Sequence, residues 1–302
     1  MKAKLKNITI GLIACIIVAF SPVGATVRIV ASLPDLGSIA SYIGGDKVEV
    51  ASIAQANANP HSVEVFPSYM AKAARASLFL KCGLALDQWA DAIIDGSRNN
   101  NLMVIDCSSG INVLEKPTGK VDASKGDVHP FGNPHYWLDP SNGVVIARNI
   151  LEGLEKVDQP NSAFYTANFE KFKSECGLKI LAWKSQINPL TGKKIISYHS
   201  SWVYFASAFG LTVSGMVEPF PGIPPSGNHL AVLVDLIKKE HCAFLIQEPY
   251  FPGDAPNFLN RQTGIPIVKC SPACADVKPL AYFAHFDAII NQIVKLTGGK
   301  QP

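Results

Sequence analysis

The stretch that decides the fold lies at residues 133–140 and reads Asn-Pro-His-Tyr-Trp-Leu-Asp-Pro. Within it, His135 stands between a proline and two aromatic residues, and Asp139 followed by proline is typical of a helix start. Two other histidines have similar surroundings: His61 follows Asn-Pro, and His199 follows an apolar run that is typical of a strand. Each of the three lies where a strand or loop gives way to a helix. This pattern predicts one imidazole-rich metal site built from several loop ends.

Short apolar runs alternate with helix-compatible segments on both sides of this stretch. Such alternation is typical of parallel sheets. In the first half of the chain, we expect strands at residues 27–33, 47–53, 78–81 and 102–105. In the second half, we expect them at residues 194–198, 211–217, 243–246 and 266–269. The expected fold class is therefore α/β, with two βα lobes that each contain a parallel sheet.

A single long helix is expected to join the lobes, because residues 160–187 are helix-compatible almost throughout. About 28 residues at 1.5 Å per residue would span roughly 40 Å, which is long for one lobe. Phe164, Phe169, Phe172 and Leu181 are expected to form its packed face. The predicted organisation is a signal peptide (1–25), an N-terminal α/β lobe (26–159), a connector helix (160–187) and a C-terminal α/β lobe (188–302).

The N-terminus is typical of a secretory signal. Three lysines among the first six residues precede an apolar run at residues 8–20, and small residues end at Ala25. Cleavage after Ala25 would leave a periplasmic protein. The alternative is a lipid anchor on Cys15 at the membrane surface, because residues 12–15 resemble a lipobox. We favour cleavage, since the apolar run continues past Cys15.

Composition narrows the function classes. The chain has 302 residues, of which 48% are hydrophobic and 17% charged, as in an ordinary globular protein. The net charge of +3 includes three lysines of the signal segment, so the mature chain is near neutral. The near-neutral charge therefore does not indicate binding to nucleic acid or to an anionic membrane surface. We also expect the protein to be a monomer.

Six cysteines remain after the signal segment. In an oxidising compartment, Cys82 could pair with Cys107 and Cys270 with Cys274. Buried free thiols are an equally good interpretation, and the sequence does not decide between the two.

The candidate ligands fall where such sheets bind ligands, which is at the carboxyl ends of the strands. His199 and Glu248 follow strands of the second half, and His61 and His135 lie in loops of the first half. All four can converge if the two sheets face each other across the connector. Imidazole suits Zn²⁺ and also binds Cu, Ni and Fe, and three histidines with a carboxylate or water give a tetrahedral site. His129, in the irregular stretch before His135, could acquire the metal transiently or be solvated, and we favour the solvated state.

These motifs resemble those of the metal-binding solute-binding proteins of bacterial ABC transporters, the zinc- and manganese-binding group. The resemblance rests on Asn-Pro-His61 followed by Glu64, on the stretch around His135, and on Tyr198-His199, in that order. It covers essentially the whole mature chain. It implies two βα lobes joined by one long helix, a metal buried between them, and ligand positions at His61, His135 and His199.

The fourth ligand position departs from the family pattern. Relatives usually carry an aspartate after the last strand of the second lobe, and the matching residue here is Ser271. Glu248, a water molecule, Asp276 and Cys270 remain as alternatives, of which we favour Glu248. Manganese-binding relatives typically replace the third histidine by glutamate, whereas this chain keeps His199. The resemblance and the imidazole ligands together favour zinc over manganese.

The expected function is that of an extracytoplasmic carrier that is not an enzyme. It would capture Zn²⁺, or less readily Mn²⁺, and deliver the ion to the membrane permease of an ABC importer. A secreted zinc hydrolase is the alternative from another class, since three histidines and a water also form a hydrolase site. The order of the motifs favours the carrier. If the histidines titrate normally, metal affinity should fall as the pH drops through about 6.5.

Overall fold

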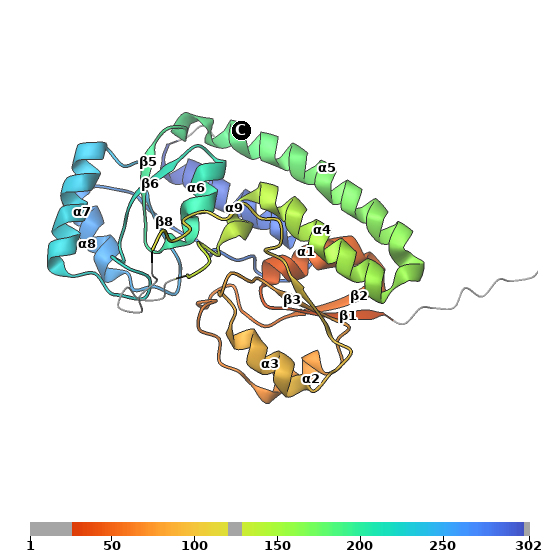
Figure 1. The fold of residues 1–302 in the computed structure, drawn as a ribbon. Coiled ribbons are helices and arrows are strands. Elements are labelled where there is room, and N and C mark those ends of the chain that lie inside the picture. Colours follow the sequence, from red (N-terminus) through yellow and green to blue (C-terminus); the bar gives the residue numbers. More distant parts are fainter. Residues whose placement is uncertain (1–25, 120–128, 299–302) are drawn as a thin grey trace, which may run out of the picture.

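The computed structural model describes residues 26–119 and 129–298 (Figure 1). The predicted signal peptide and Cys15 lie outside the described residues. The described chain forms two parallel four-stranded sheets covered by helices, which confirms the α/β fold class with two lobes. The domain boundaries given above remain predictions.

The N-terminal lobe contains the first sheet, in the order β2-β1-β3-β4. Its strands are β1 (Val27–Ala31), β2 (Val48–Ser52), β3 (Leu78–Lys81) and β4 (Met103–Asp106). Its helices are α1 (Pro34–Gly44), α2 (Pro67–Ala73), α3 (Trp89–Ser97) and α4 (Pro140–Val157). As predicted, Asp139 caps α4: its carboxylate accepts a hydrogen bond from the Ser141 amide at 2.8 Å, and Pro140 follows in the first turn.

The C-terminal lobe repeats the arrangement in the order β6-β5-β7-β8. Its strands are β5 (Lys194–Ser197), β6 (Thr212–Met216), β7 (Leu245–Gln247) and β8 (Ile267–Lys269). Its helices are α6 (Val203–Ala208), α7 (Gly227–Glu240), α8 (Asp254–Thr263) and α9 (Ala281–Leu296). Each strand lies within two residues of its predicted bounds, because the β-branched runs and the turns between them are clear in the sequence.

The connector is helix α5 (Ser162–Ile187), which runs along one side of the molecule from one lobe to the other (Figure 1). Its 26 residues correspond to about 39 Å. Phe169 and Phe172 are buried as predicted, but Phe164 and Leu181 are 37% and 68% exposed. Leu181 follows Phe172 by nine residues, which is half a turn away at about 100° per residue, so it faces solvent.

The two lobes share one hydrophobic core. Ile29 and Leu80 of the first sheet belong to the same buried cluster as Ile195 and Phe244 of the second. Helix α9 of the C-terminal lobe packs against α1 and α5. A hydrogen bond also crosses between the lobes, from Trp137 Nε1 to the Pro272 carbonyl at 2.7 Å. This shared core holds the two sheets in a defined relative position.

All six cysteines that follow residue 25 are described, and all are free thiols. The pairs considered above, Cys82 with Cys107 and Cys270 with Cys274, are therefore not disulfides in this structure. Burial raises the pKa of the Cys82 and Cys107 thiols well above their usual range, which keeps them protonated.

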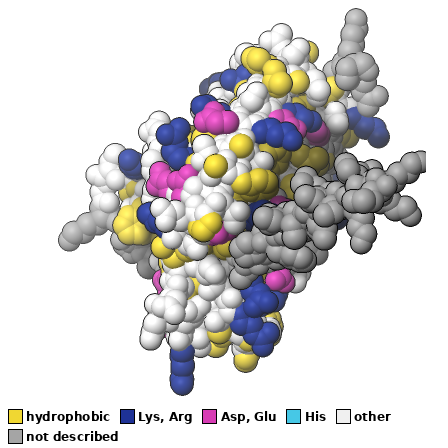
Figure 2. Space-filling view, turned by 90° about the vertical axis from the view of Figure 1, so that its right-hand side faces the viewer, with side chains coloured by type: hydrophobic (Ala, Val, Ile, Leu, Met, Phe, Trp, Pro, Cys, Tyr) yellow, Lys and Arg dark blue, Asp and Glu magenta, His cyan; other side chains and the backbone are white. Residues whose placement is uncertain are grey.

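The surface carries mixed charge. On the face shown in Figure 2, basic and acidic side chains are interspersed with apolar ones. Across residues 26–119 and 129–298, no helix combines the length and the apolar character needed to cross a membrane.

Two helical glycines offer a matched test of the packing between lobes. A Cβ added at Gly143 of α4 would lie 2.8 Å from Cε1 of the buried Tyr282 in α9, whereas a Cβ at Gly177 of α5 would meet no atom within 4 Å. We expect Gly143→Ala to lower the free energy of unfolding by about 1–3 kcal/mol through overpacking. We expect Gly177→Ala to raise it by up to about 1 kcal/mol through helix propensity. Chemical denaturation measures the free energy of unfolding of both variants. An equal change in the two variants would contradict the packing described here.

Candidate metal centre

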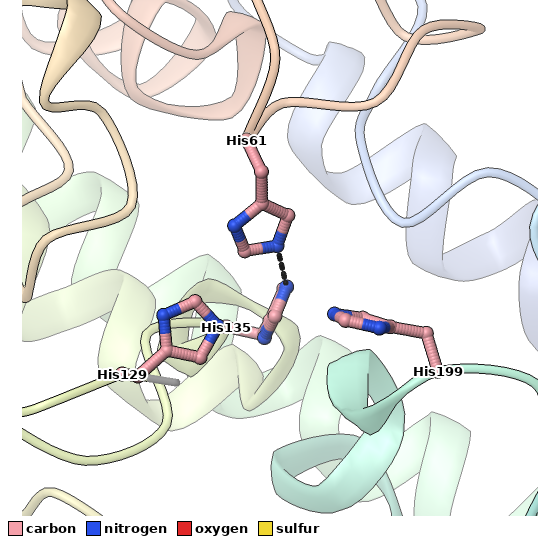
Figure 3. A group of neighbouring side chains, drawn as sticks. All are labelled: His61, His129, His135 and His199. Atoms are coloured by element: carbon pink, nitrogen blue, oxygen red, sulfur yellow. Dashed lines mark hydrogen bonds between the residues drawn. The ribbon is translucent and has the colours of Figure 1, made fainter. Parts of the chain in front are cut away.

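Four histidines meet between the lobes: His61, His129, His135 and His199. One potential ligand atom from each lies within 4.8 Å of the other three. Figure 3 shows the four rings gathered around a common centre, from separate segments of the chain. The structure thus brings together the three predicted histidines and adds a fourth. The prediction that His129 is solvated is wrong.

The same local motif positions two of the rings. In each Asn-Pro-His sequence, the asparagine Oδ1 accepts a hydrogen bond from the histidine amide, at 3.0 Å for both Asn59–His61 and Asn133–His135. Asn133 Oδ1 also lies 2.9 Å from His135 Nδ1, which fixes the ring and leaves Nε2 directed at the centre. The Asn side chain therefore connects each loop backbone to its ligand.

His199 comes from the C-terminal lobe, two residues after β5. Its Nδ1 lies 2.8 Å from a carboxylate oxygen of Glu218, and both side chains are buried. The Glu218 carboxylate also accepts a hydrogen bond from the Gly222 amide at 3.3 Å. A proton on Nδ1, donated to Glu218, leaves the His199 Nε2 lone pair free for a metal.

A turn brings His129 to the group. The His129 carbonyl accepts a hydrogen bond from the Gly132 amide at 3.1 Å, and Gly132 has a φ of 101°, which favours glycine. The His129 ring stacks on the His61 ring at a centroid distance of 4.9 Å. It also lines a cleft of about 260 Å³, together with Glu115 and Phe220. His129 therefore lies between the other histidines and this cleft.

The nitrogen positions fit a metal ion. Nε2 of His61 and Nε2 of His135 are 3.1 Å apart. Two nitrogens bound to a tetrahedral zinc ion at 2.0–2.1 Å would be about 3.3 Å apart. Nε2 of His129 and Nε2 of His199 are buried and have no hydrogen-bond partner among the described residues. A cation between the rings would give a partner to these two nitrogens.

Comparison with known proteins then identifies the family. The model of the ZnuA family, described as the periplasmic component A of a zinc-uptake complex, matches residues 29–296. The chain belongs to the ZnuA family. It is therefore a metal-binding substrate-binding protein of an ABC transporter, of the kind that pairs with a membrane permease, and it is not an enzyme. The hydrolase alternative is set aside.

Relatives of this ZnuA-family chain differ in the metal that their names give. The manganese ABC transporter substrate-binding lipoprotein PsaA of Streptococcus pneumoniae is 24% identical over 251 residues, 81% of this chain and 79% of PsaA. A zinc-bound ZnuA deletion mutant is 26% identical, with a TM-score of 0.77 over 92% of this chain and 100% of that one. The Mn²⁺ complex of FpvC from Pseudomonas aeruginosa shares the fold, with 23% identity and a TM-score of 0.78 over 90% and 99% of the two chains.

None of the side chains considered for the fourth ligand of this ZnuA-family site belongs to the group of four histidines. Glu248 is fully buried and accepts a hydrogen bond from Trp202 Nε1 at 3.1 Å, but it is not one of the four grouped side chains. Asp276 binds the Lys278 ammonium at 2.9 Å. Burial raises the pKa of the Cys270 thiol, and Cys270 is not one of the four grouped side chains either.

Sequence reasoning missed Glu218 and did not place His129 among the grouped histidines. A signal for Glu218 was present, because it directly follows the predicted strand 211–217, as His199 and Glu248 follow theirs. His129 lies six residues before His135, with Pro-Phe-Gly between them as a turn signal.

Burial changes the proton affinity of the ligands. It lowers the pKa of His61 and of His135 well below the usual 6.5, and the neighbouring imidazoles lower it further. Burial likewise lowers the pKa of His129 to about 4. These three rings stay neutral, and so able to bind a metal, at pH values where free histidine is protonated.

We therefore expect zinc affinity to depend only weakly on pH between 6.5 and 5.5. A ligand with a lowered pKa releases no proton when the metal binds, so the slope of log Kd against pH should be about 1 or less. Competition titrations at several pH values would measure this slope. A slope of about two or more in magnitude would mean that the histidines titrate as free side chains, as the sequence alone led us to expect.

Proposed function

We propose that this protein captures Zn²⁺ outside the cytoplasm and delivers it to the permease of its ABC transporter. The observation that carries this proposal is the ligand set: four imidazole nitrogens within 4.8 Å of one another, with no carboxylate among them. Imidazole favours zinc, whereas manganese prefers oxygen ligands. We propose His61, His129, His135 and His199 as the ligands, so that His129 takes the fourth position for which Glu248 was the first candidate.

The relatives do not decide the metal, since PsaA is named for manganese and ZnuA for zinc. The donor atoms of this chain therefore provide the stronger argument. A manganese carrier of the same family is the second candidate, and its support is the name of PsaA rather than any feature of this site. Zinc is therefore the cargo that the geometry favours.

We place the protein in the periplasm after cleavage behind Ala25. The second possibility is a lipid anchor on Cys15, which is in keeping with the description of PsaA as a lipoprotein. Either location exposes the cleft at His129 to metal outside the cytoplasm. Mass spectrometry of the mature protein separates the two, because only cleavage before Cys15 leaves an acylated cysteine as the first residue.

The ligand set can be tested by titrating residues 26–302 with Zn²⁺ and Mn²⁺ in competition. We expect zinc to bind at least about 100-fold more tightly than manganese, in line with the order of affinities for nitrogen ligands. Alanine at His61, His135 or His199 should each weaken zinc binding by about 100-fold or more, since each removes a metal bond. His241→Asn is a matched control: His241 ends α7 in the left-handed conformation that asparagine tolerates.

The position of His129 needs a spectroscopic measurement. Co²⁺ in place of zinc gives visible absorption bands that report its ligands. We expect His129→Ala to shift these bands, since water would replace an imidazole. Unchanged bands would return the fourth position to Glu248 or to water, and a preference for manganese would overturn the zinc proposal.

A further inference from the structure

Two buried carboxylates flank His199. The strand order β6-β5-β7 puts the carboxyl ends of these three strands side by side, with His199 after the central one. Glu218 follows β6, and its amide donates to the Tyr198 carbonyl at 3.0 Å. Glu248 follows β7, where the Tyr198 amide donates to the Ile246 carbonyl at 2.8 Å. The topology therefore sets one glutamate on each side of the ligand.

No lysine or arginine in the described part of the chain forms an ion pair with either carboxylate, and the only ring hydrogen-bonded to Glu218 there is that of His199. Glu218 is 6% exposed and Glu248 is 0% exposed. One oxygen of Glu248 is buried with no hydrogen-bond partner. A buried carboxylate without a cation is costly. Two of them beside one metal site need an explanation.

Charge balance supplies that explanation. Four neutral imidazoles bring no charge, so a divalent ion among them would add two uncompensated positive charges to the interior. Carboxylates at Glu218 and Glu248, one on each side of His199, would offset those two charges. We propose that Glu218 and Glu248 are the charge-balancing residues of the cargo site and that they stabilise a divalent cation held by the imidazoles. This inference rests on the proposed function.

Orientation of the ring does not by itself require a carboxylate. In the same site, the neutral Asn133 side chain holds His135 Nδ1 at 2.9 Å, while Glu218 holds His199 Nδ1 at 2.8 Å. An amide therefore suffices to fix a ligand here. What Glu218 adds is a carboxyl group in place of an amide, and Glu248, which is hydrogen-bonded to Trp202, adds a second one.

The test replaces each carboxylate by its neutral isostere. Glu218→Gln keeps an oxygen for His199 Nδ1, and Glu248→Gln keeps one for Trp202, so both preserve shape and remove charge. Zn²⁺ competition titration should show about a 10- to 100-fold loss of affinity for each variant and a larger loss for the double variant. Glu64→Gln is the matched control, because Glu64 is an exposed carboxylate whose charge water screens.

A second measurement separates charge from ligation and from folding. The Co²⁺ absorption bands of both variants should keep their positions, and the metal-free variants should unfold at the same temperature as the wild type or above it. Zinc affinity equal to that of the wild type would overturn the inference while leaving the proposed function intact. Shifted bands in Glu248→Gln would also overturn it, by making Glu248 a direct ligand. A wild-type protein that binds no zinc would overturn both proposals.

Discussion

The direction in which the imidazole nitrogens point is the constraint on which the rest of this structure depends. An ion entering the site must lose its water, and that loss is offset only if the ligand atoms are already in place. Hydrogen bonds to Nδ1 set this direction for His135, through Asn133, and for His199, through Glu218. Burial completes the preparation, since it keeps His61 and His135 neutral.

The fold supports this arrangement through repetition. The two sheets have equivalent strand orders. In each sheet, the loops at the carboxyl ends of the strands lie next to the space between the lobes. Ile29 and Ile195 belong to one hydrophobic core, and this common core keeps the two sets of loops facing each other. Neither lobe could assemble the group alone, because His199 lies in the second lobe and the other three histidines precede α5.

The sequence predicted the fold and most of the site, because their signals are local. Alternating strands and helices indicated the sheets, and Asn-Pro before His61 and His135 marked candidate ligands held by their own loops. Contacts between residues that are far apart in the sequence were harder to predict. Leu181 was placed on the wrong face of α5, and Glu218 was overlooked although its partner His199 was chosen. His129 was judged by its polar surroundings, whereas a single turn brings its ring onto His61.

The two lobes contribute unequally to the site. The N-terminal lobe supplies three neutral imidazoles, and the C-terminal lobe supplies one imidazole with Glu218 and Glu248 beside it. An ion left on the N-terminal ligands would lose a ligand and the adjacent negative charge together. Metal–nitrogen bonds tolerate changes of only about 0.2 Å. Since the shared core opposes a wide opening, we expect a small displacement of the lobes to be enough to release the ion.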